Sequence, residues 1–166
     1  MKILVTGGAG YIGSHVIRAL QKAGHEAIAL DDMSFGISSR LGGTELVQFD
    51  LSASDSAIKL EKVFTEKAID GVIHLAARKS VAESVARPEY YYRQNVDSVI
   101  NILEAMKNAG LSKLVFSSSA AAYGSPDKDL VDENYICQPI NPYGETKLIG
   151  EWLINAASKS WQLDAV

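Results

Sequence analysis

The sequence predicts an α/β fold in which helices cover both faces of a parallel sheet. Short apolar segments alternate along the chain with longer segments of helical periodicity, and strands that alternate with helices are joined in parallel. A glycine-rich turn joins the first strand to the first helix, as in doubly wound sheets. We expect one domain, residues 1–166, because chains of this length ordinarily form a single core.

The first half of the chain predicts three strands and two helices. The run Ile-Leu-Val-Thr at 3–6 is typical of a buried strand, and apolar residues recur at helical spacing over 11–23, just before the helix-ending Gly24. Apolar runs predict two more strands and a helix that presents Ile58, Val63 and Phe64 on one side. These three elements lie at residues 26–30, 45–49 and 54–67.

The second half continues the alternation. A strand at 71–75 precedes a long helix at 88–108, with Pro88 in its first turn and Gly110 just past its end. A fifth strand, a last helix and the start of a sixth strand are expected at 113–116, 142–159 and 163–166. Residues 124–141 show no periodicity, and a long irregular loop in a compact domain is more often functional than idle.

Composition excludes several classes of function. The formal charge is −4, with 16 basic and 20 acidic residues and no basic block, which argues against a nucleic-acid partner. No apolar run approaches the roughly 20 residues that span a membrane, and the amino terminus is too short and lacks the cleavage site of a signal peptide. The single Cys137 forms no internal disulfide, so we expect a cytoplasmic protein. The three histidines lie on different elements without metal-ligand spacing, so we expect no metal site.

The segment TGGAGYIG predicts a phosphate-binding turn. Gly7, Gly10 and Gly13 form GxxGxxG, and Gly8 with the last two also satisfies GxGxxG. Glycines let the backbone approach a pyrophosphate, which the amide groups at the helix amino terminus then bind. The alternative is a tight strand-to-helix turn that binds nothing.

Acidic residues at the ends of the second and third strands predict the adenosine side of a dinucleotide site. Asp31 follows Gly13 by 18 residues, where a carboxylate accepts hydrogen bonds from a ribose diol. It would repel a 2′-phosphate, which favours NAD over NADP. Asp32 is the alternative ribose ligand, or else a solvated acid at the strand end. Asp50 and Leu51 either flank the adenine or form a helix-capping turn.

Tyr143 and Lys147 lie four residues apart at the start of the last helix and therefore share one face. A tyrosine with the ordinary pKa of about 10 is a poor base near neutrality, and a neighbouring ammonium group favours its phenolate. At the end of the fifth strand, Ser119 can donate its hydroxyl to a substrate oxygen, and the small Ala120 to Ala122 leave room beside it. The alternatives are a helical surface pair and an ordinary Ser/Ala turn.

Seven segments together carry a family resemblance: VTGGAGYIGSH, LDD, FDL, HLAARKSVAESV, YYYRQNV, SSSAAAYG and NPYGETK. On these segments the chain resembles extended short-chain dehydrogenase/reductases, most closely the UDP-glucose 4-epimerase family. The resemblance implies a Rossmann-type fold with tightly held NAD. It makes Ser119, Tyr143 and Lys147 the catalytic residues, the first two of which also bind substrate. The residues that it implies for the cofactor are Gly7, Gly10, Tyr11, Ile12, Gly13, Asp31, Asp32, Ser34, Asp50, Leu51, Leu75, Ala76, Ala77, Lys79, Asn95, Ser117, Tyr143 and Lys147.

Without the resemblance, Lys79 is a solvated loop lysine and Asn95 makes an interhelical hydrogen bond. Family members often carry Asn at the positions of Asp32 and Phe35. They are also about twice as long as this chain, so we expect it to lack the lobe that binds the nucleotide sugar. In family members, the helices that begin at Pro88 and at the tyrosine form a dimer interface, so a homodimer is expected.

The implied activity is the interconversion of UDP-glucose and UDP-galactose by transient oxidation at sugar C4. Tyr143 would take the proton of the 4-hydroxyl while C4 gives hydride to NAD, and the hydride returns to the other face of the 4-keto sugar. The isolated 166-residue chain is expected to be inactive. One alternative is another nucleotide-sugar epimerase, dehydratase or decarboxylase. Dehydratases carry an Asp-Glu pair where this chain has Ala120 and Ala121. The other alternative is a non-catalytic NAD-binding module.

Overall fold

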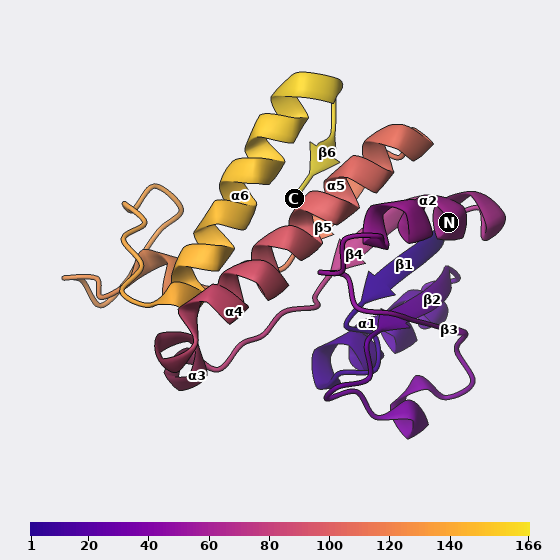
Figure 1. Cartoon of the computed structure of the whole chain (residues 1–166), viewed down its shortest axis with the longest axis horizontal. Coiled ribbons are helices and arrows are strands. Elements are labelled where there is room, and N and C mark those ends of the chain that lie inside the picture. Colours follow the sequence, from indigo (N-terminus) through magenta and orange to yellow (C-terminus); the bar gives the residue numbers. More distant parts are fainter.

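Six parallel strands form one sheet in the order β3-β2-β1-β4-β5-β6 (Figure 1). The computed structural model describes residues 1–166. The chain starts in the middle of the sheet, proceeds to one edge and then returns to build the other half. The connection reverses between β1 and β4, and ligands bind at such a switch point beyond the carboxyl ends of the strands. The strands are β1 Lys2–Thr6, β2 Glu26–Asp31, β3 Leu46–Gln48, β4 Gly71–His74, β5 Lys113–Phe116 and β6 Asp164–Ala165.

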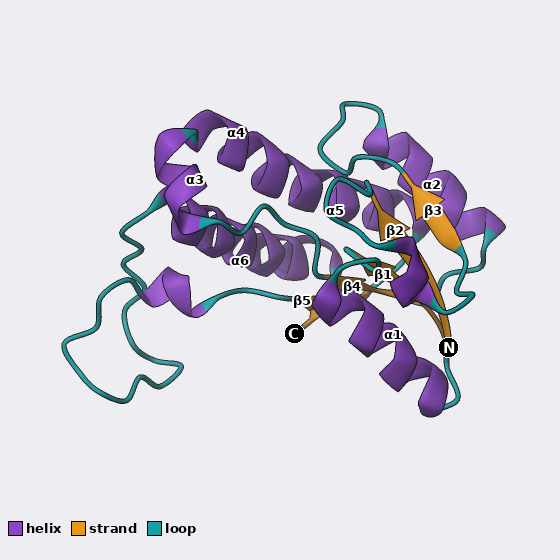
Figure 2. Cartoon of the chain, turned by 90° about the horizontal axis from the view of Figure 1, so that it is seen from below, coloured by secondary structure: helices purple, strands orange, loops and turns teal.

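The helices lie on the two faces of this sheet (Figure 2). One α-helix, α1, covers one face, and α2, α5 and α6 cover the other. The α-helices are α1 Tyr11–Lys22, α2 Ser56–Glu66, α3 Val81–Ala86, α4 Pro88–Tyr92, α5 Ser98–Ala109 and α6 Pro142–Trp161. Short 3₁₀ turns occupy η1 Ser38–Leu41 and η3 Ala120–Tyr123, and a π-helical turn, η2 Arg93–Asp97, joins α4 to α5.

Two apolar cores result from the alternation of side chains along the strands. On the face of α1, Ile3 and Val5 of β1 pack with Ile17. On the other face, Leu4 packs in a larger core with residues of β4, β5, α2, α5 and α6. Coverage is uneven on the smaller side, because Val115 of β5 remains 45% exposed. No helix of the chain is both long enough and apolar enough to span a membrane.

The predicted helix over 88–108 contains a break that its apolar periodicity does not reveal. The backbone stays helical, but residues 93–97 form a π turn, which adds one residue to a single turn of helix. This turn directs Asn95 inward, where only 4% of it is exposed. Helix α3 was not predicted because it has only six residues. Its signal is a capping box, in which Ser80 accepts a hydrogen bond from the backbone of Glu83 at 3.3 Å.

The other differences are confined to the ends of elements. Strand β3 keeps three of the five residues expected over 45–49, and β6 two of the four over 163–166. Residues 124–141 contain no helix or strand, as expected, and extend away from the sheet in both views (Figures 1 and 2).

Candidate functional site

Two glycines, one in the turn after β1 and one in the first turn of α1, occupy positions that exclude a side chain. Gly7 has a φ of +68°, and a Cβ there would lie 3.0 Å from the backbone of Ala76, just after β4. A Cβ on Gly13 would lie 2.1 Å from the carbonyl oxygen of Gly7. The helix therefore packs closely on the turn only because both positions lack a side chain.

The amino terminus of α1 is open to an anion. Gly10 precedes the helix without a side-chain cap, and the first turn holds no acidic residue. The first amide groups of a helix have no partners within it, and this end carries partial positive charge. Tyr11 and Ile12 stand exposed beside these groups. The arrangement suits a phosphate or diphosphate.

A cavity of about 590 Å³ opens at this turn, within the range of small-molecule and cofactor sites. The residues predicted to bind the cofactor line it, except for Asn95, Tyr143 and Lys147. The predicted residues in its wall are Gly7, Gly10, Tyr11, Ile12, Gly13, Asp31, Asp32, Ser34, Asp50, Leu51, Leu75, Ala76, Ala77, Lys79 and Ser117. They come from the ends of β1 to β5 and the start of α1. The cavity therefore lies at the carboxyl ends of the strands.

Asp31 is held rigidly at the end of β2. Only 7% of it is exposed, and its two oxygens accept hydrogen bonds from the backbone of Ala9 at 3.0 Å and of Met33 at 2.9 Å. The first bond ties the carboxylate to the glycine turn. A fixed carboxylate beside an anion-binding turn fits the ribose and diphosphate of a dinucleotide.

Asp32 is not the solvated acid that one alternative expected. Its Oδ2 forms an ion pair with Arg78 at 2.7 Å, and the two side chains are 26% and 14% exposed. Its Oδ1 accepts hydrogen bonds from the backbone and hydroxyl of Ser34 at 2.9 and 2.6 Å. The structure thus separates the two neighbouring acids, because Asp31 is bonded to the glycine turn and Asp32 to the loop after β4.

Asp50 both lines the cavity and forms a turn before α2. Its Oδ1 accepts hydrogen bonds from the backbone and hydroxyl of Ser52 at 2.8 and 2.7 Å, and its carbonyl accepts one from Ser56 at 2.6 Å. Burial acts to raise the pKa of Asp50, but these bonds from Ser52, together with Gln94 and the charge of Arg78, outweigh it and lower that pKa below its usual value. Asp50 is therefore held as a carboxylate, which is an acceptor for an amino group.

Lys147 connects α6 to the end of β5. It is 4% exposed, its Nζ donates to the carbonyl of Ser117 at 2.9 Å, and the same atom lies 5.0 Å from the centre of the Phe116 ring. Burial lowers the pKa of Lys147 to about 8. Because Ser117 lines the cavity, this bond fixes the base of α6 directly behind the cavity wall.

Ser119 and Tyr143 lie on two segments that touch, although neither lines the cavity. Ser119 caps η3, accepting from the backbone of Ala121 at 3.2 Å, and Tyr143 is in the first turn of α6. A Cβ on Gly144 would lie 2.5 Å from the carbonyl oxygen of Ala121. Because Gly144 has no side chain, the first turn of α6 packs directly on the backbone of η3.

Asn95 takes the role that sequence reasoning gave as the alternative. Its amide nitrogen donates to the carbonyl of Arg78 and the hydroxyl of Thr146, each at 3.0 Å, and its Oδ1 accepts from the backbone of Arg78 at 2.8 Å. It does not line the cavity. The structure makes Asn95 a link between η2, α6 and the loop after β4, and its place beside the cofactor stays a prediction.

His74 is buried at the end of β4 and is neutral. The Thr6 hydroxyl accepts hydrogen bonds from the backbone of Leu75 and Ala76, so its proton points to Nδ1 of His74 at 2.7 Å. Burial, and after it the charge of Lys147, lower the pKa of His74 to about 3. The structure thus gives the expected strand-end histidine a fixed place in the core.

Sequence reasoning missed several residues of the cavity wall, of which Arg78, Phe35 and Gln94 are the most prominent. One signal was available for Arg78. An additional acid at Asp32 needs a compensating cation when it lies in a half-buried loop, and the segment HLAARKSVAESV offers one.

Comparisons with known proteins agree on one family. The model of the NAD dependent epimerase/dehydratase family matches residues 3–166. The UDP-glucose 4-epimerase of Lactobacillus helveticus is 42% identical over 160 residues, which cover 96% of this chain and 48% of that protein. The chain spans about half the length of the curated relatives it matches.

Solved structures show the same fold. A crystal structure of UDP-glucose 4-epimerase from Brucella ovis in complex with NAD superposes with a TM-score of 0.94 at 35% identity, covering 99% of this chain and 50% of that one. The structure of the UDP-Glc/GlcNAc 4-epimerase from Campylobacter jejuni gives a TM-score of 0.92, also at 35% identity, with coverage of 99% and 51%.

Proposed function

This chain belongs to the NAD-dependent epimerase/dehydratase family, and from that premise we propose that it forms the cofactor-binding and catalytic half of an enzyme that interconverts UDP-glucose and UDP-galactose. The glycine turn, the buried Asp31 and the cavity between them fit NAD. The proposed substrate rests on relatives that are named UDP-glucose 4-epimerase and that match this chain over nearly its whole length.

The observation that carries the proposal is the bond from Lys147 to the carbonyl of Ser117. It fixes the motif-bearing end of α6 behind the cavity wall, on the side where β4 and β5 end. A helical surface pair would leave the lysine in water, whereas this one is 4% exposed. Burial of a charged amine costs desolvation free energy, and such groups are typical of functional sites.

In the proposed reaction, NAD held by the glycine turn and Asp31 would supply a reversible hydride acceptor for sugar C4. The Tyr143 oxygen takes the proton of the sugar 4-hydroxyl, and the Ser119 hydroxyl donates a hydrogen bond to the same substrate oxygen. Lys147, with its pKa of about 8, is mostly an ammonium at pH 7 and favours negative charge on its neighbour one helical turn earlier.

The residues after β5 favour epimerisation over dehydration. Elimination of water needs an acid and a base beside the sugar, and Ala120 and Ala121 supply neither. A UDP-sugar is therefore the proposed partner. We further propose a homodimer through the helices of the α5 and α6 side, and the cytoplasm as the compartment.

The test is to purify the 166-residue protein, denature it and identify any released nucleotide by mass spectrometry and absorbance. We expect NAD at close to one molecule per chain. Release of NADP alone, or a protein that neither carries nor takes up NAD, would contradict the proposal. In a parallel assay with UDP-galactose, we expect no turnover by the 166-residue chain alone, and measurable turnover would refute that expectation.

A further inference from the structure

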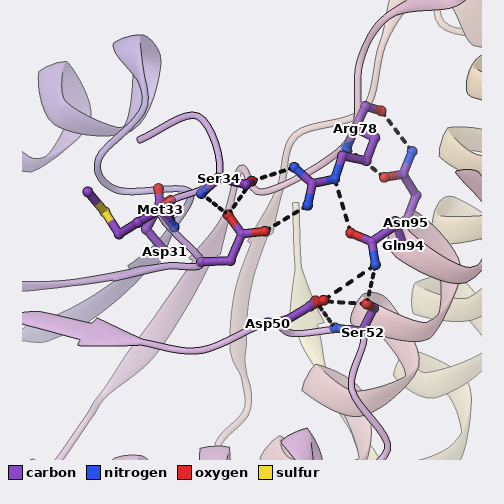
Figure 3. A network of polar contacts seen from close by, with 9 residues as sticks. Asp31, Met33, Ser34, Asp50, Ser52, Arg78, Gln94 and Asn95 are labelled. Carbon is purple, nitrogen blue, oxygen red and sulfur yellow. Dashed lines mark hydrogen bonds and ion pairs between the residues drawn. The ribbon is translucent and has the colours of Figure 1, made fainter. Parts of the chain in front are cut away.

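The side chain of Arg78 is bonded to two other parts of the cavity wall. Its guanidinium donates to Asp32 Oδ2 at 2.7 Å and to the Ser34 hydroxyl at 2.6 Å, and its Nε donates to Gln94 Oε1 at 3.0 Å (Figure 3). The first two partners belong to the loop after β2, and Gln94 belongs to η2. Arg78 itself follows β4, so one side chain joins three elements.

The backbone of Arg78 is fixed as firmly as its side chain. Asn95 bonds both the amide and the carbonyl of Arg78, at 2.8 and 3.0 Å. The planar guanidinium therefore extends from a backbone that is held on both sides. Its donors point in fixed directions, which suits it for joining two walls of a cavity.

The network continues to the loop after β3. Gln94 accepts from Arg78 and donates to the Ser52 hydroxyl at 2.5 Å, and Ser52 in turn donates to Asp50 at 2.7 Å (Figure 3). An unbroken chain of hydrogen bonds thus runs from Asp32 to Asp50. It follows the half of the cavity in which Asp31, the proposed ribose ligand, lies.

Aromatic side chains lie close to the guanidinium. It is 5.3 Å from the centre of the Phe35 ring and 5.8 Å from that of Tyr90, within the range of cation–π contacts. Phe35 lines the cavity and is 78% exposed. A large apolar side chain that is this exposed at the edge of a cavity is available to cover an apolar ring.

We propose that Arg78 is a positioning residue that clamps the loop of residues 32–36 to η2 across the adenosine half of the cavity and so slows the release of the dinucleotide. The inference rests on the assignment of NAD. Charge-assisted bonds in a half-buried setting are stronger than exposed ones, so opening the clamp has an appreciable cost. Since its guanidinium is already paired with Asp32, it is not available to bind the 2′-phosphate of NADP.

The test is the rate of release of NADH from the loaded 166-residue protein. The protein is mixed with excess NAD, and the decay of bound-NADH fluorescence gives the dissociation rate constant. We expect Arg78→Leu to raise it about tenfold, which corresponds to about 1.4 kcal/mol. Arg78→Lys keeps the charge but not the fork of donors, and Asp32→Asn removes the ion pair, so each is expected to raise the rate about threefold.

Arg87→Leu is the matched control. Arg87 also pairs with an acid, Glu83 at 3.0 Å, and lies 4.1 Å from the Tyr90 ring centre. It is exposed, however, and Glu83 lies only four residues before it, so the pair does not join the loop after β2 to η2. We expect this variant to release NADH within twofold of the parent. The double variant Asp32→Asn/Arg78→Leu should release NADH no faster than Arg78→Leu, because both changes break the same clamp. If the two substitutions instead acted by separate structural damage, their effects on the release rate would add in the double variant.

The outcomes separate the clamp from the cofactor assignment. A parent protein that does not bind NADH overturns both. NADH binding with an unchanged release rate in Arg78→Leu overturns the clamp alone, as does a change that Arg87→Leu reproduces. A gain of tenfold or more in NADP affinity without a change in NADH release also overturns it. If Arg78→Leu does not fold, unchanged release rates in both Arg78→Lys and Asp32→Asn decide against the clamp.

Discussion

Two buried titratable side chains, His74 and Lys147, meet at the ring of Phe116. The imidazole stacks on it with ring centres 5.8 Å apart, and the amine lies 5.0 Å from its centre. A second positive charge here would repel Lys147. Burial, and after it the charge of Lys147, lower the pKa of His74 to about 3, so the imidazole stays neutral and Lys147 is left as the sole cation of the pair.

The neutral His74 makes folding stability depend on pH. Its pKa falls from 6.5 in the unfolded chain to about 3 in the folded one, so between these values the unfolded state binds more protons. The contribution of the neutral imidazole to the free energy of unfolding is complete above pH 6.5. It is lost as the pH falls towards 3, and the free energy of unfolding then decreases by up to about 1.4 kcal/mol per pH unit. The free energy of unfolding, measured with urea at several pH values from 6.5 to 4, should fall less steeply with falling pH in His74→Gln than in the parent.

The control for this measurement is His25→Gln, which removes a half-exposed histidine from the turn before β2. The free energy of unfolding of this variant should depend on pH as steeply as that of the parent. A slope in His74→Gln as steep as that of the parent would show that other groups cause the acid sensitivity.

Gly13 allows α1 to pack closely on the phosphate-binding turn, because it has no side chain. In Gly13→Ala, a Cβ 2.1 Å from the Gly7 carbonyl oxygen must displace backbone, and such overpacking costs roughly 1–3 kcal/mol. We expect a lower melting temperature and weaker NAD binding by calorimetry. Gly10→Ala, whose Cβ would lie 3.1 Å from the same oxygen, should be milder. Equal effects of the two substitutions would argue against this packing.

Individual residues were predictable where a local pattern dictates their chemistry. The glycines and Asp31 follow from a strand-turn-helix motif. The partners of Arg78 could not be predicted, because Asp32 in the loop after β2 and Gln94 in η2 are brought to it only by the fold. Asn95 was placed against the cofactor by resemblance, whereas its hydrogen bonds depend on a π turn that no sequence pattern indicated.

Among the elements, the π turn η2 connects the cavity wall to the helical face of the sheet. Through Asn95 it holds the loop after β4 and the hydroxyl of Thr146 in α6. Tyr92, one residue before the turn, donates to Glu145 in α6, and this bond, with burial, raises the pKa of Tyr92 to about 12. The two helices and the loop that carries Arg78 are thus fixed together.

Removal of the Asn95 amide should therefore destabilise the whole arrangement. Asn95→Ala leaves buried partners without hydrogen bonds, which costs about 2 kcal/mol. Unfolding in guanidinium chloride, monitored by circular dichroism, would measure this loss of stability. Asn108→Ala removes an exposed bond to Glu61 of 2.7 Å and should change the unfolding free energy by less than about 0.5 kcal/mol. A similar loss for both variants would contradict the linking role of Asn95.

Element types were predicted well because apolar periodicity determines them. All six strands and the long helices lie where expected, apart from their ends. Helix α3 and the 3₁₀ turns are too short for periodicity to show. Their signals are local caps, such as Ser80 with Glu83 and Ser119 with Ala121.

At the scale of the whole molecule, the two faces of the sheet differ in how they are covered. The larger core lies under α2, α5 and α6, whereas the other face carries α1 alone and leaves Val115 half-exposed. The order of the six strands could not be read from the sequence, since alternation fixes only that they are parallel.

The helical side also carries exposed apolar side chains that fit the proposed homodimer. Ile100 on α5 is 43% exposed and Trp152 on α6 is 62% exposed. We expect sedimentation velocity to give a dimer of the 17.9 kDa chain and Trp152→Arg to shift it towards monomer. Leu130→Arg, a change at an 88% exposed residue of the loop at 124–141, should leave the dimer intact. A monomeric parent would refute the proposed dimer.

The central claim is that the glycine turn, Asp31 and the Tyr143–Lys147 pair converge on one dinucleotide. A crystal structure of the protein with NAD tests it most directly. We expect the diphosphate at the amino terminus of α1, the adenosine ribose on Asp31, and the Tyr143 hydroxyl in contact with the nicotinamide half. NAD bound elsewhere, or a nicotinamide ring out of reach of Tyr143, would contradict the account.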